Sequence, residues 1–191
     1  LAEEVYKPAH GLVVTSATLT DRTGDPEADW HAAEIRTGTR HLPVRPLQSS
    51  ENSPFDHVKN LKILVVGDVR KGDMDQTAAA YRDLFKAAGG GGLGLFTAIS
   101  RLHAVEQRIR EPLENADIPL LAQHVDPLDT GSLVDIFRAE ENACLLGTDA
   151  VRDGVDVPGQ SLRILVFDRV PWPRPDLLHK ARRKAFGGKV Y

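Results

Sequence analysis

The amino-acid sequence predicts an α/β fold with a mostly parallel β-sheet, and two observations support this prediction. Short apolar runs of strand length alternate repeatedly with helical patterns along the chain, which is typical of successive βαβ units. Polar residues and glycines also gather where the apolar runs end. Because right-handed crossovers bring the carboxyl ends of parallel strands to one edge, we expect a ligand site along that edge.

The predicted strands are short apolar runs bounded by turn residues, as expected for strands buried on both faces. The first begins at Leu12 and continues into a stretch of threonines and serine, whose hydroxyls can line a site. Threonine is also a common strand residue, so these hydroxyls need not have a ligand. The later predicted strands cover Leu61–Val66, Leu93–Phe96, Pro119–Ala122, Ala143–Leu146 and Leu162–Phe167.

The predicted helices are recognised by their start signals and by apolar residues at helical spacing. Asp25-Pro26 places a cap residue before a proline and predicts a helix that ends at Gly38. A second helix, over 75–88, carries Tyr81 and Phe85 on one face. Further helices are expected after the capping residue Ser100, over Asp129–Glu141 and, with a basic face, over Leu177–Phe186.

The composition is that of a globular protein in a reducing compartment. The chain has 191 residues, 41% of them hydrophobic and 27% charged, with a formal net charge of −3, so nucleic-acid binding would need a local basic patch or backbone amides. The single cysteine, Cys144, excludes an internal disulfide and the spacing of a zinc or iron–sulfur site. No apolar stretch approaches the roughly 18 residues of a membrane span. We therefore expect a cytoplasmic protein without a membrane partner.

Two glycine-rich stretches do not fit a nucleotide-phosphate loop. Such a loop has the pattern G-x-x-x-x-G-K-[ST] between a strand and the helix that it opens. Gly89–Gly92 instead follows a predicted helix and precedes a strand, which is typical of a helix stop. Gly187-Gly188-Lys189 is not followed by serine or threonine. The 191 residues therefore contain no phosphate loop of their own.

The stretch Gly147–Gly159, GTDAVRDGVDVPG, connects two predicted strands and holds a threonine, an arginine and three aspartates. It is either an ordinary connection between strands or a set of ligand contacts at the carboxyl edge of the sheet. The order of motifs along the chain favours the second interpretation.

These motifs resemble the second motor domain of superfamily 2 helicases, in particular the XPD/DinG-like branch of ATP-dependent DNA helicases. The resemblance covers nearly the whole chain and rests on several segments in the expected order. They are TSATLT at Thr15–Thr20, which looks like motif III, SPFD at Ser53–Asp56, GLFTAIS at Gly94–Ser100, similar to motif IV, RDGVDVPG at Arg152–Gly159, similar to motif V, and DRVPWPRP at Asp168–Pro175.

The resemblance implies a RecA-like three-layer domain and a division of the chain into three parts. Residues 1–20 would form the motif III segment at the junction with the first motor domain. Residues 21–60 would be a polar helix and loop connection. Residues 61–191 would be the second motor domain, truncated before motif VI, which carries the arginine finger.

The resemblance also implies roles for particular residues. The ATP cleft would be lined by Gly154, Asp156, Arg152 and Asp153. Motif III, with Thr15, Ser16, Ala17 and Thr18, would couple the nucleotide state to the grip on the strand. Nucleic acid would contact Thr97, Ser100, Thr148, Arg169 and Trp172.

Several of these residues have a simpler alternative interpretation. Asp156 could form a turn or a helix cap, and Ser100 could cap its own helix with or without a phosphate contact. Trp172 could pack over its own domain. Two departures from the family pattern, Ala98 in place of a serine and Val151-Arg152-Asp153 in place of Phe-Trp-Glu, indicate a divergent member with altered nucleic-acid contacts.

The function implied is half of an ATP-dependent DNA helicase. ATP and Mg²⁺ would be bound in the intact protein, and the chain alone is predicted to bind neither and to be inactive. No iron–sulfur cluster is encoded in this chain. Its partners would be single-stranded or forked DNA and the first RecA-like motor domain of the same polypeptide, with no oligomer required. The alternative is a stand-alone RecA-like module that binds nucleotide or protein without catalysis.

Overall fold

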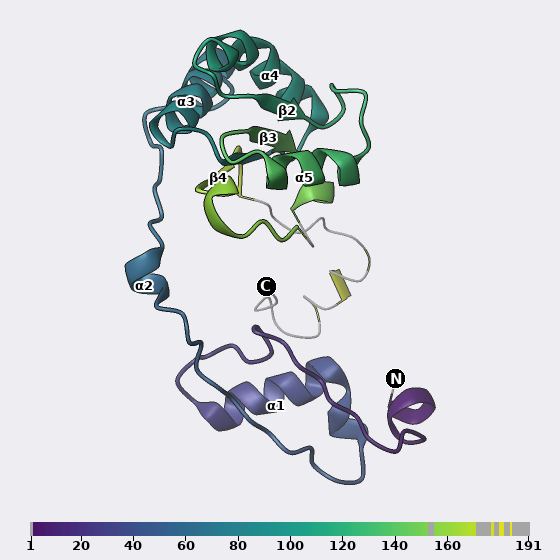
Figure 1. The fold of residues 1–191 in the computed structure, drawn as a ribbon. Helices are drawn as coiled ribbons and strands as arrows, with labels where there is room; N and C mark the ends of the chain where they lie inside the picture. The colour runs from purple at the N-terminus through teal and green to yellow at the C-terminus, as the bar shows by residue number, and fades with distance from the viewer. Residues whose placement is uncertain (1, 153–154, 171–176, 178–179, 182–183, 185–191) are drawn as a thin grey trace. The chain divides into compact units, whose positions relative to one another are not determined.

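The structure is a computed structural model, and it describes residues 2–152, 155–170, 177, 180, 181 and 184. The chain divides into two compact units, Leu1–Ile63 and Leu64–Tyr191. Figure 1 shows helices without a sheet in the first unit and a sheet between helices in the second.

The second unit is built on a four-stranded sheet in which every pairing is parallel. The strands are β1 (Gly92–Leu95), β2 (Leu120–Ala122), β3 (Cys144–Gly147) and β4 (Ile164–Phe167), in the spatial order β2-β3-β1-β4. Helices α3 (Met74–Ala87) and α4 (Ile99–Glu114) cover one face, and α5 (Thr130–Ala139) covers the other (Figure 1). The predicted RecA-like α/β fold with a parallel sheet is confirmed.

Helices α3 and α5 begin where the sequence supplies a capping aspartate. Asp73 accepts a hydrogen bond from the backbone N–H of Gln76, and Asp129 accepts one from that of Ser132. A side-chain oxygen at this position satisfies one of the N–H groups that a helix leaves unpaired at its start.

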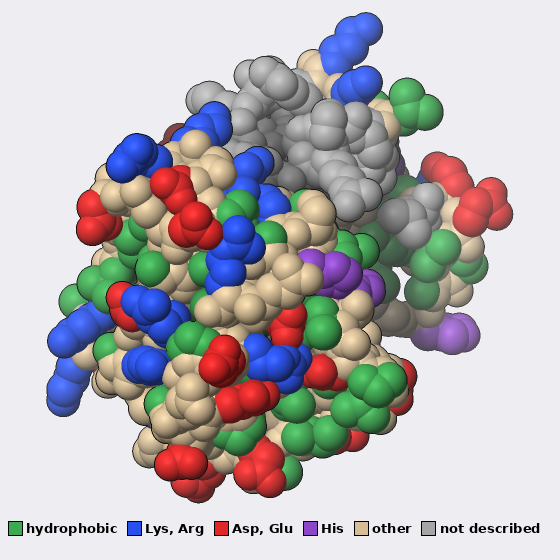
Figure 2. Space-filling view, turned by 90° about the horizontal axis from the view of Figure 1, so that it is seen from above, with side chains coloured by type: hydrophobic (Ala, Val, Ile, Leu, Met, Phe, Trp, Pro, Cys, Tyr) green, Lys and Arg blue, Asp and Glu red, His purple; other side chains and the backbone are tan. Residues whose placement is uncertain are grey.

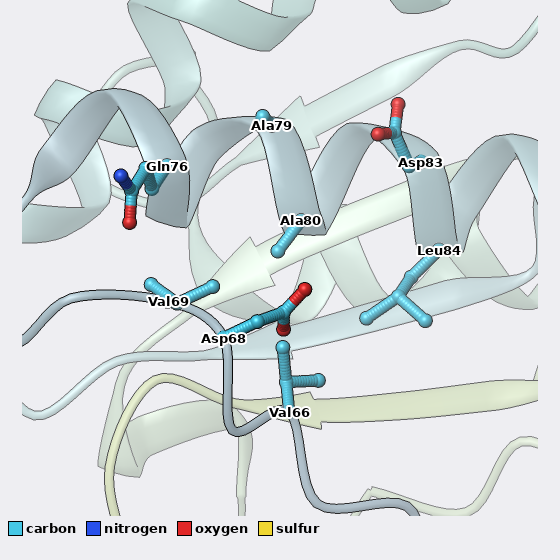
Figure 3. Close-up of a pocket in the computed structure, with 8 residues that line it drawn as sticks. All are labelled: Val66, Asp68, Val69, Gln76, Ala79, Ala80, Asp83 and Leu84. Atoms are coloured by element: carbon cyan, nitrogen blue, oxygen red, sulfur yellow. The ribbon is translucent and has the colours of Figure 1, made fainter.

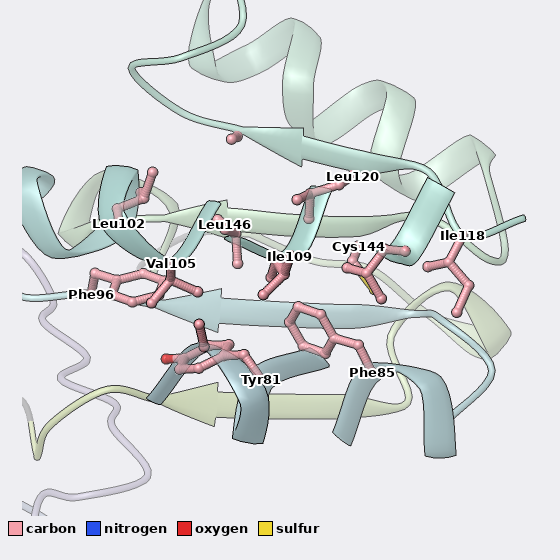
Figure 4. Close-up of a cluster of buried hydrophobic side chains, with 13 residues drawn as sticks. Tyr81, Phe85, Phe96, Leu102, Val105, Ile109, Ile118, Leu120, Cys144 and Leu146 are labelled. Carbon is pink, nitrogen blue, oxygen red and sulfur yellow. The ribbon is translucent and has the colours of Figure 1, made fainter. Parts of the chain in front are cut away.

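The core of this unit consists of two hydrophobic clusters, one on each face of the sheet. Figure 4 shows the first, in which Tyr81 and Phe85 of α3 and Val105 and Ile109 of α4 lie over the sheet. The second packs residues of α5, such as Phe137, against the opposite face. Because every member of these clusters is at most 8% exposed, they are the main source of stability for the unit.

Two glycines in β1 allow α3 to approach the sheet closely. A Cβ atom at Gly92 would lie 2.4 Å from the ring of Phe85, and one at Gly94 would lie 2.7 Å from the ring of Tyr81. A side chain at either position would therefore push the aromatic rings away from the strand.

At the amino ends of the strands, a single arginine connects three loops. The guanidinium of Arg163 donates hydrogen bonds to the backbone carbonyls of Ala88, Gly89, Glu141 and Gln160, at 2.6–3.1 Å. The carbonyls of Ala88 and Gly89 follow α3, that of Glu141 follows α5, and that of Gln160 precedes β4. Arg163 therefore holds together the loops at the amino edge of the sheet. The edge that was expected to bind ligand is the opposite, carboxyl edge.

The first unit is held together mainly by polar contacts around α1 (Pro26–Thr37). Its short neighbours are η1 (Ala2–Tyr6), η2 (Thr39–His41) and α2 (His57–Asn60). The buried carboxylate of Glu34 accepts from Arg45 and Gln48 at 2.7 and 2.8 Å. The hydrogen bond from Arg45 lowers the pKa of Glu34 below its usual range. The predicted start of α1 is confirmed, since Asp25 caps the helix and Gly38, with φ of 82°, ends it.

Two predicted strands are wrong. Residues 12–14 and 61–66 have no strand conformation, and Ile63 and Val65 are 83% and 92% exposed. Apolar composition alone predicted these strands, but a strand forms only when its backbone groups pair with those of a neighbouring strand. The four strands of the sheet pair only with one another among the described residues. The predicted last helix lies mostly outside the described residues, although Leu177, Lys180, Ala181 and Lys184 are helical.

Candidate functional site at the carboxyl edge of the sheet

The carboxyl ends of the four parallel strands lie along one edge, as the sequence predicted. Backbone hydrogen bonds continue just beyond the strands, from Phe96 N to the carbonyl of Gly147, from Gln123 N to that of Leu146, and from Asp168 N to that of Leu95, each at 2.9 Å. The segments that follow β1, β2, β3 and β4 are therefore held next to one another in the order of the sheet.

The segment after β1 leads directly into α4. Thr97 and Ser100 are both exposed, as a contact with a ligand would require. The prediction that Ser100 caps α4 is wrong, because the N-cap residue is Ala98 and no side chain caps the helix. Ala98 stands where the family usually has a serine, so the departure noted in the sequence removes the side chain that would have capped α4. Backbone N–H groups at the start of a helix attract anions.

The segments after β2 and β3 are joined by Gln123, which was not among the predicted site residues. The side-chain oxygen of Gln123 accepts from both the backbone N–H and the hydroxyl of Thr148, each at 2.9 Å. Its side-chain nitrogen donates to the hydroxyl of Thr130 at 3.0 Å. Its position as a polar residue directly after the predicted strand Pro119–Ala122 could have identified Gln123 as a site residue from the sequence.

The loop after β3 begins at this edge and then turns back along α5. Gly147 allows the turn, since a Cβ atom there would lie 2.0 Å from the side chain of Val151. Arg152 forms an ion pair with Asp149 at 3.0 Å. Asp153 and Gly154 lie outside the described residues.

Asp156 lies farther along the same loop and is exposed. Its backbone carbonyl accepts a hydrogen bond at 3.0 Å from Arg138, which belongs to the last turn of α5. The flanking Val157 belongs to the cluster beneath α5, and the partly buried Val155 packs against that cluster. Thr148 therefore lies at the carboxyl edge of the sheet beside Gln123, whereas Asp156 is held near the carboxyl end of α5, which leads into the amino end of β3.

The segment after β4 is fixed by an ion pair. Asp168, whose side chain is fully buried, accepts from Arg101 of α4 through two hydrogen bonds of 2.7 and 2.6 Å. Arg101 follows Ser100, so this pair ties the start of α4 to the end of β4. Arg169 is exposed, and Trp172 lies outside the described residues. The spacing of these residues in the sequence gave no sign of the Arg101–Asp168 pair.

Motif III belongs to the other unit, Leu1–Ile63. Thr15, Ser16, Ala17 and Thr18 are all exposed. The hydroxyl of Ser16 accepts from the backbone N–H of Thr18 at 3.1 Å, which closes a short turn. The coupling role of motif III stays a prediction.

The remaining surfaces offer weaker candidates. Figure 2, which looks down on the molecule from above the view of Figure 1, shows basic and acidic side chains interspersed. Ion pairs also join Arg82 to Asp83 within α3 and Arg108 of α4 to Asp75 of α3. Figure 3 shows a shallow groove of about 430 Å³ between α3 and the segment that precedes it, lined mostly by alanine, valine and leucine and by two aspartates. It lies away from the motifs described above.

Metal and thiol chemistry have little support in the described part of the chain. No group of three histidine, cysteine, aspartate or glutamate side chains there could hold a metal ion. Burial raises the pKa of Cys144 to about 12, so its thiol is not reactive near neutral pH. No helix in the described ranges is long and apolar enough to cross a membrane.

Comparison with known proteins shows which family the chain resembles. Residues 81–190 match the Helicase C-terminal domain family. The chain is 35% identical over 196 residues to the ATP-dependent helicase DinG of Mycobacterium tuberculosis (strain ATCC 25618 / H37Rv), a match that covers 99% of this chain and 28% of that protein. It is 29% identical to the 3'-5' exonuclease DinG of Bacillus subtilis (strain 168), over 95% of this chain and 20% of that protein.

A third relative is the ATP-dependent DNA helicase YoaA of Escherichia coli (strain K12), which is 27% identical over 86% of this chain and 24% of its own length. The chain thus spans less than a third of each of these relatives. The family match begins within α3 and covers the sheet and the segments along its carboxyl edge. The chain therefore belongs to the Helicase C-terminal domain family and is a DinG-like member of it.

Proposed function

We propose that the chain is the second motor domain of an ATP-dependent DNA helicase, in which it supplies one side of the ATP cleft and part of the surface for single-stranded DNA. The observation that carries this proposal is the alignment of the segments after β1, β3 and β4 along one edge of a parallel sheet, within a region that matches a helicase family. Open α/β sheets bind ligands at this edge.

The nucleic-acid contacts are assigned to the strand ends. Thr97 and Ser100 lie at the uncapped start of α4, where backbone N–H groups and hydroxyls can donate to phosphate oxygens. Thr148 follows β3. Arg169 follows β4 and is exposed, and its guanidinium lies 3.8 Å from the carboxylate of Asp168. Trp172 would stack on a base. Such contacts hold the backbone of the strand without reading its sequence.

The ATP contacts are assigned to the loop after β3. The exposed carboxylate of Asp156 can accept hydrogen bonds from ribose hydroxyls, as acidic residues do in other nucleotide sites. Arg152, Asp153 and Gly154 complete this side of the cleft in the proposal. The triphosphate and Mg²⁺ are assigned to the first motor domain, because no phosphate loop occurs in these 191 residues.

In this arrangement, ATP supplies the energy of a phosphoryl transfer that depends mainly on positioning and charge stabilisation. The residues of this chain would hold the nucleotide from one side and the DNA backbone from the other. Motif III, at Thr15–Thr18, would connect the two when the cleft closes. The intact protein would act on single-stranded or forked DNA in the cytoplasm.

DNA binding by the chain itself tests the nucleic-acid half of the proposal. The affinity for a fluorescent single-stranded oligonucleotide is measured by anisotropy over a series of salt concentrations. Arg169→Ala should weaken binding and reduce the salt slope by about 0.7, the contribution of one phosphate contact on a single strand. The matched control is Lys86→Ala, since Lys86 is an exposed cation at the end of α3 and should leave the slope unchanged.

ATP turnover tests the other half. The purified chain should show no ATP hydrolysis, with or without DNA, because the proposal places triphosphate binding in another domain. Turnover by the chain alone would contradict the assignment. Equal losses of DNA affinity in Arg169→Ala and Lys86→Ala would contradict the placement of the DNA surface.

A further inference from the structure

A nearly buried glutamine connects three parts of the carboxyl edge of the sheet. Gln123, directly after β2, is 5% exposed. Its side-chain oxygen accepts from the N–H and the hydroxyl of Thr148, after β3, and its nitrogen donates to Thr130, in the first turn of α5. All the polar atoms of this side chain therefore have partners, and both donors of Thr148 are directed at one oxygen.

The orientation of the glutamine amide follows from its partners. A backbone N–H can only donate, so the atom that faces the N–H of Thr148 has to be the oxygen of Gln123 and not its nitrogen. The nitrogen is then left to face the hydroxyl of Thr130, which can accept. The same oxygen is thus also the acceptor for the Thr148 hydroxyl.

The backbone that carries Gln123 is itself held in place. Its N–H donates to the carbonyl of Leu146 in β3 at 2.9 Å. The preceding N–H, of Ala122, donates to the carboxylate of Asp126 at 2.7 Å, and Arg110 donates to Asp126 at 3.0 Å. These hydrogen bonds fix the backbone at Gln123, so its side chain can hold the start of the loop after β3 in one position.

We propose that Gln123 is a positioning residue that orients Thr148 for its contact with a nucleic-acid phosphate, and this inference rests on the proposed function. With both Thr148 donors on Gln123, the threonine holds one side-chain rotamer before DNA arrives. When a phosphate binds, the hydroxyl proton rotates about the Cβ–Oγ bond and is donated to the phosphate oxygen, while the backbone N–H stays on Gln123. Ordering the side chain in advance lowers the entropic cost of binding.

The test compares Gln123→Met with the control Gln107→Met. Methionine has a similar length but cannot accept these hydrogen bonds, and Gln107 is an exposed residue of α4. Three-bond NMR couplings to the Thr148 methyl carbon report its χ1 rotamer. We expect one rotamer in the parent chain and in Gln107→Met, and averaged couplings in Gln123→Met.

The second readout is binding of single-stranded DNA. Gln123→Met and Thr148→Val should each lower the affinity about three- to tenfold, the range of one net hydrogen bond. The double variant should be no weaker than Thr148→Val, because the glutamine acts through the threonine. The salt slope should stay that of the parent chain, whereas general damage to the edge would lower it by removing charged contacts.

Unchanged Thr148 couplings in Gln123→Met would overturn the proposal, and so would averaged couplings with unchanged DNA affinity. If Gln123→Met does not fold, Thr130→Val carries the test, since it removes only the acceptor of the glutamine nitrogen. Averaged Thr148 couplings and a smaller loss of affinity are then expected, and unchanged couplings overturn the proposal.

The outcomes separate this inference from the proposed function. If the parent chain binds no DNA, the proposed DNA surface fails and the role of Gln123 towards phosphate fails with it. If the parent chain binds DNA and Arg169→Ala lowers the salt slope, but Gln123→Met binds as the parent does, only the positioning role fails.

Discussion

The two units of the chain differ in what holds them together. In the unit Leu64–Tyr191, two hydrophobic clusters lie on the two faces of a parallel sheet, and residues such as Phe85 and Phe137 are fully buried. In the unit Leu1–Ile63, the only buried hydrophobic residue is Ala33 among those that the structure describes, and the other buried residues are Asp29, Glu34 and Thr39. Apolar burial stabilises the first, and charged hydrogen bonds organise the second.

Because of this difference, the predicted site residues at the edge of the sheet are held in place more firmly than those of motif III. The segments at the edge of the sheet are fixed by a core that forms within their own unit. Thr15–Thr18 belong to a unit with little apolar burial, and a polar network alone seldom gives a stable fold.

Separating the two units should have the largest effect. A chain of residues 64–191 should unfold cooperatively on heating, because it retains both hydrophobic clusters. A chain of residues 1–63 should show no cooperative transition. Circular dichroism against temperature measures both, and a sharp transition in the 1–63 chain would show that its polar network suffices.

Truncating a core aromatic should destabilise the sheet unit strongly. Phe85→Ala removes a fully buried ring that lies against Gly92, and we expect a loss of about 3–5 kcal/mol in the free energy of unfolding. Trp30→Ala in α1 removes a half-buried ring and should change the free energy of the main transition by less than about 0.5 kcal/mol. Urea unfolding followed by circular dichroism measures both, and similar losses would remove the contrast between the units.

Removing the arginine that joins the loops at the amino edge should have an intermediate effect. Arg163→Ala leaves the carbonyls of Ala88, Gly89 and Gln160 without their shared donor, so we expect a loss of about 1–3 kcal/mol. Arg138→Ala is the control, because its guanidinium donates to one carbonyl, that of Asp156, and to an exposed aspartate. Chemical denaturation measures both, and equal losses would refute the bridging role of Arg163.

Restoring the missing cap of α4 should stabilise the sheet unit slightly. Ala98→Ser supplies a hydroxyl at the uncapped N-cap position, and we expect a gain of about 1 kcal/mol. Ala87→Ser, at the end of α3, is the matched control and should give no gain. The melting temperatures of the three proteins give the result, and a fall for Ala98→Ser would mean that the start of α4 has no room for a cap.

Acid should affect the polar unit through Glu34. Because the hydrogen bond from Arg45 lowers its pKa in the folded state, Glu34 contributes stability above its unfolded pKa. That contribution is lost as the pH falls through the lower folded value. The helical signal of α1, followed by NMR of Ala33, should therefore decline below about pH 4. In Glu34→Gln the acid-dependent part of the decline should be absent, and an identical decline in both proteins would exclude Glu34 as its cause.

The sequence predicted the parts of the sheet unit that depend on local pattern. Alternating strands and helices gave the α/β class, and the end of α3 was predicted from the glycine run that begins at Gly89. Leu61–Val66 shows the limit of this reasoning, because a run of apolar residues looks the same in the sequence whether or not it pairs with a neighbouring strand. Ser100 shows another, since the cap is set by the backbone of Ala98 and not by the nearest hydroxyl.

The order of the motifs, and the edge of the sheet where the segments after β1, β3 and β4 meet, follow from the amino-acid sequence, because the carboxyl ends of parallel strands lie at the same edge. The side chains that hold this edge in place follow instead from the three-dimensional packing. Gln123 and Thr148 are 25 residues apart, and Arg101 and Asp168 are 67 apart. Contacts between residues so distant in the chain depend on the packing of neighbouring strands, and this packing cannot be predicted from local sequence patterns.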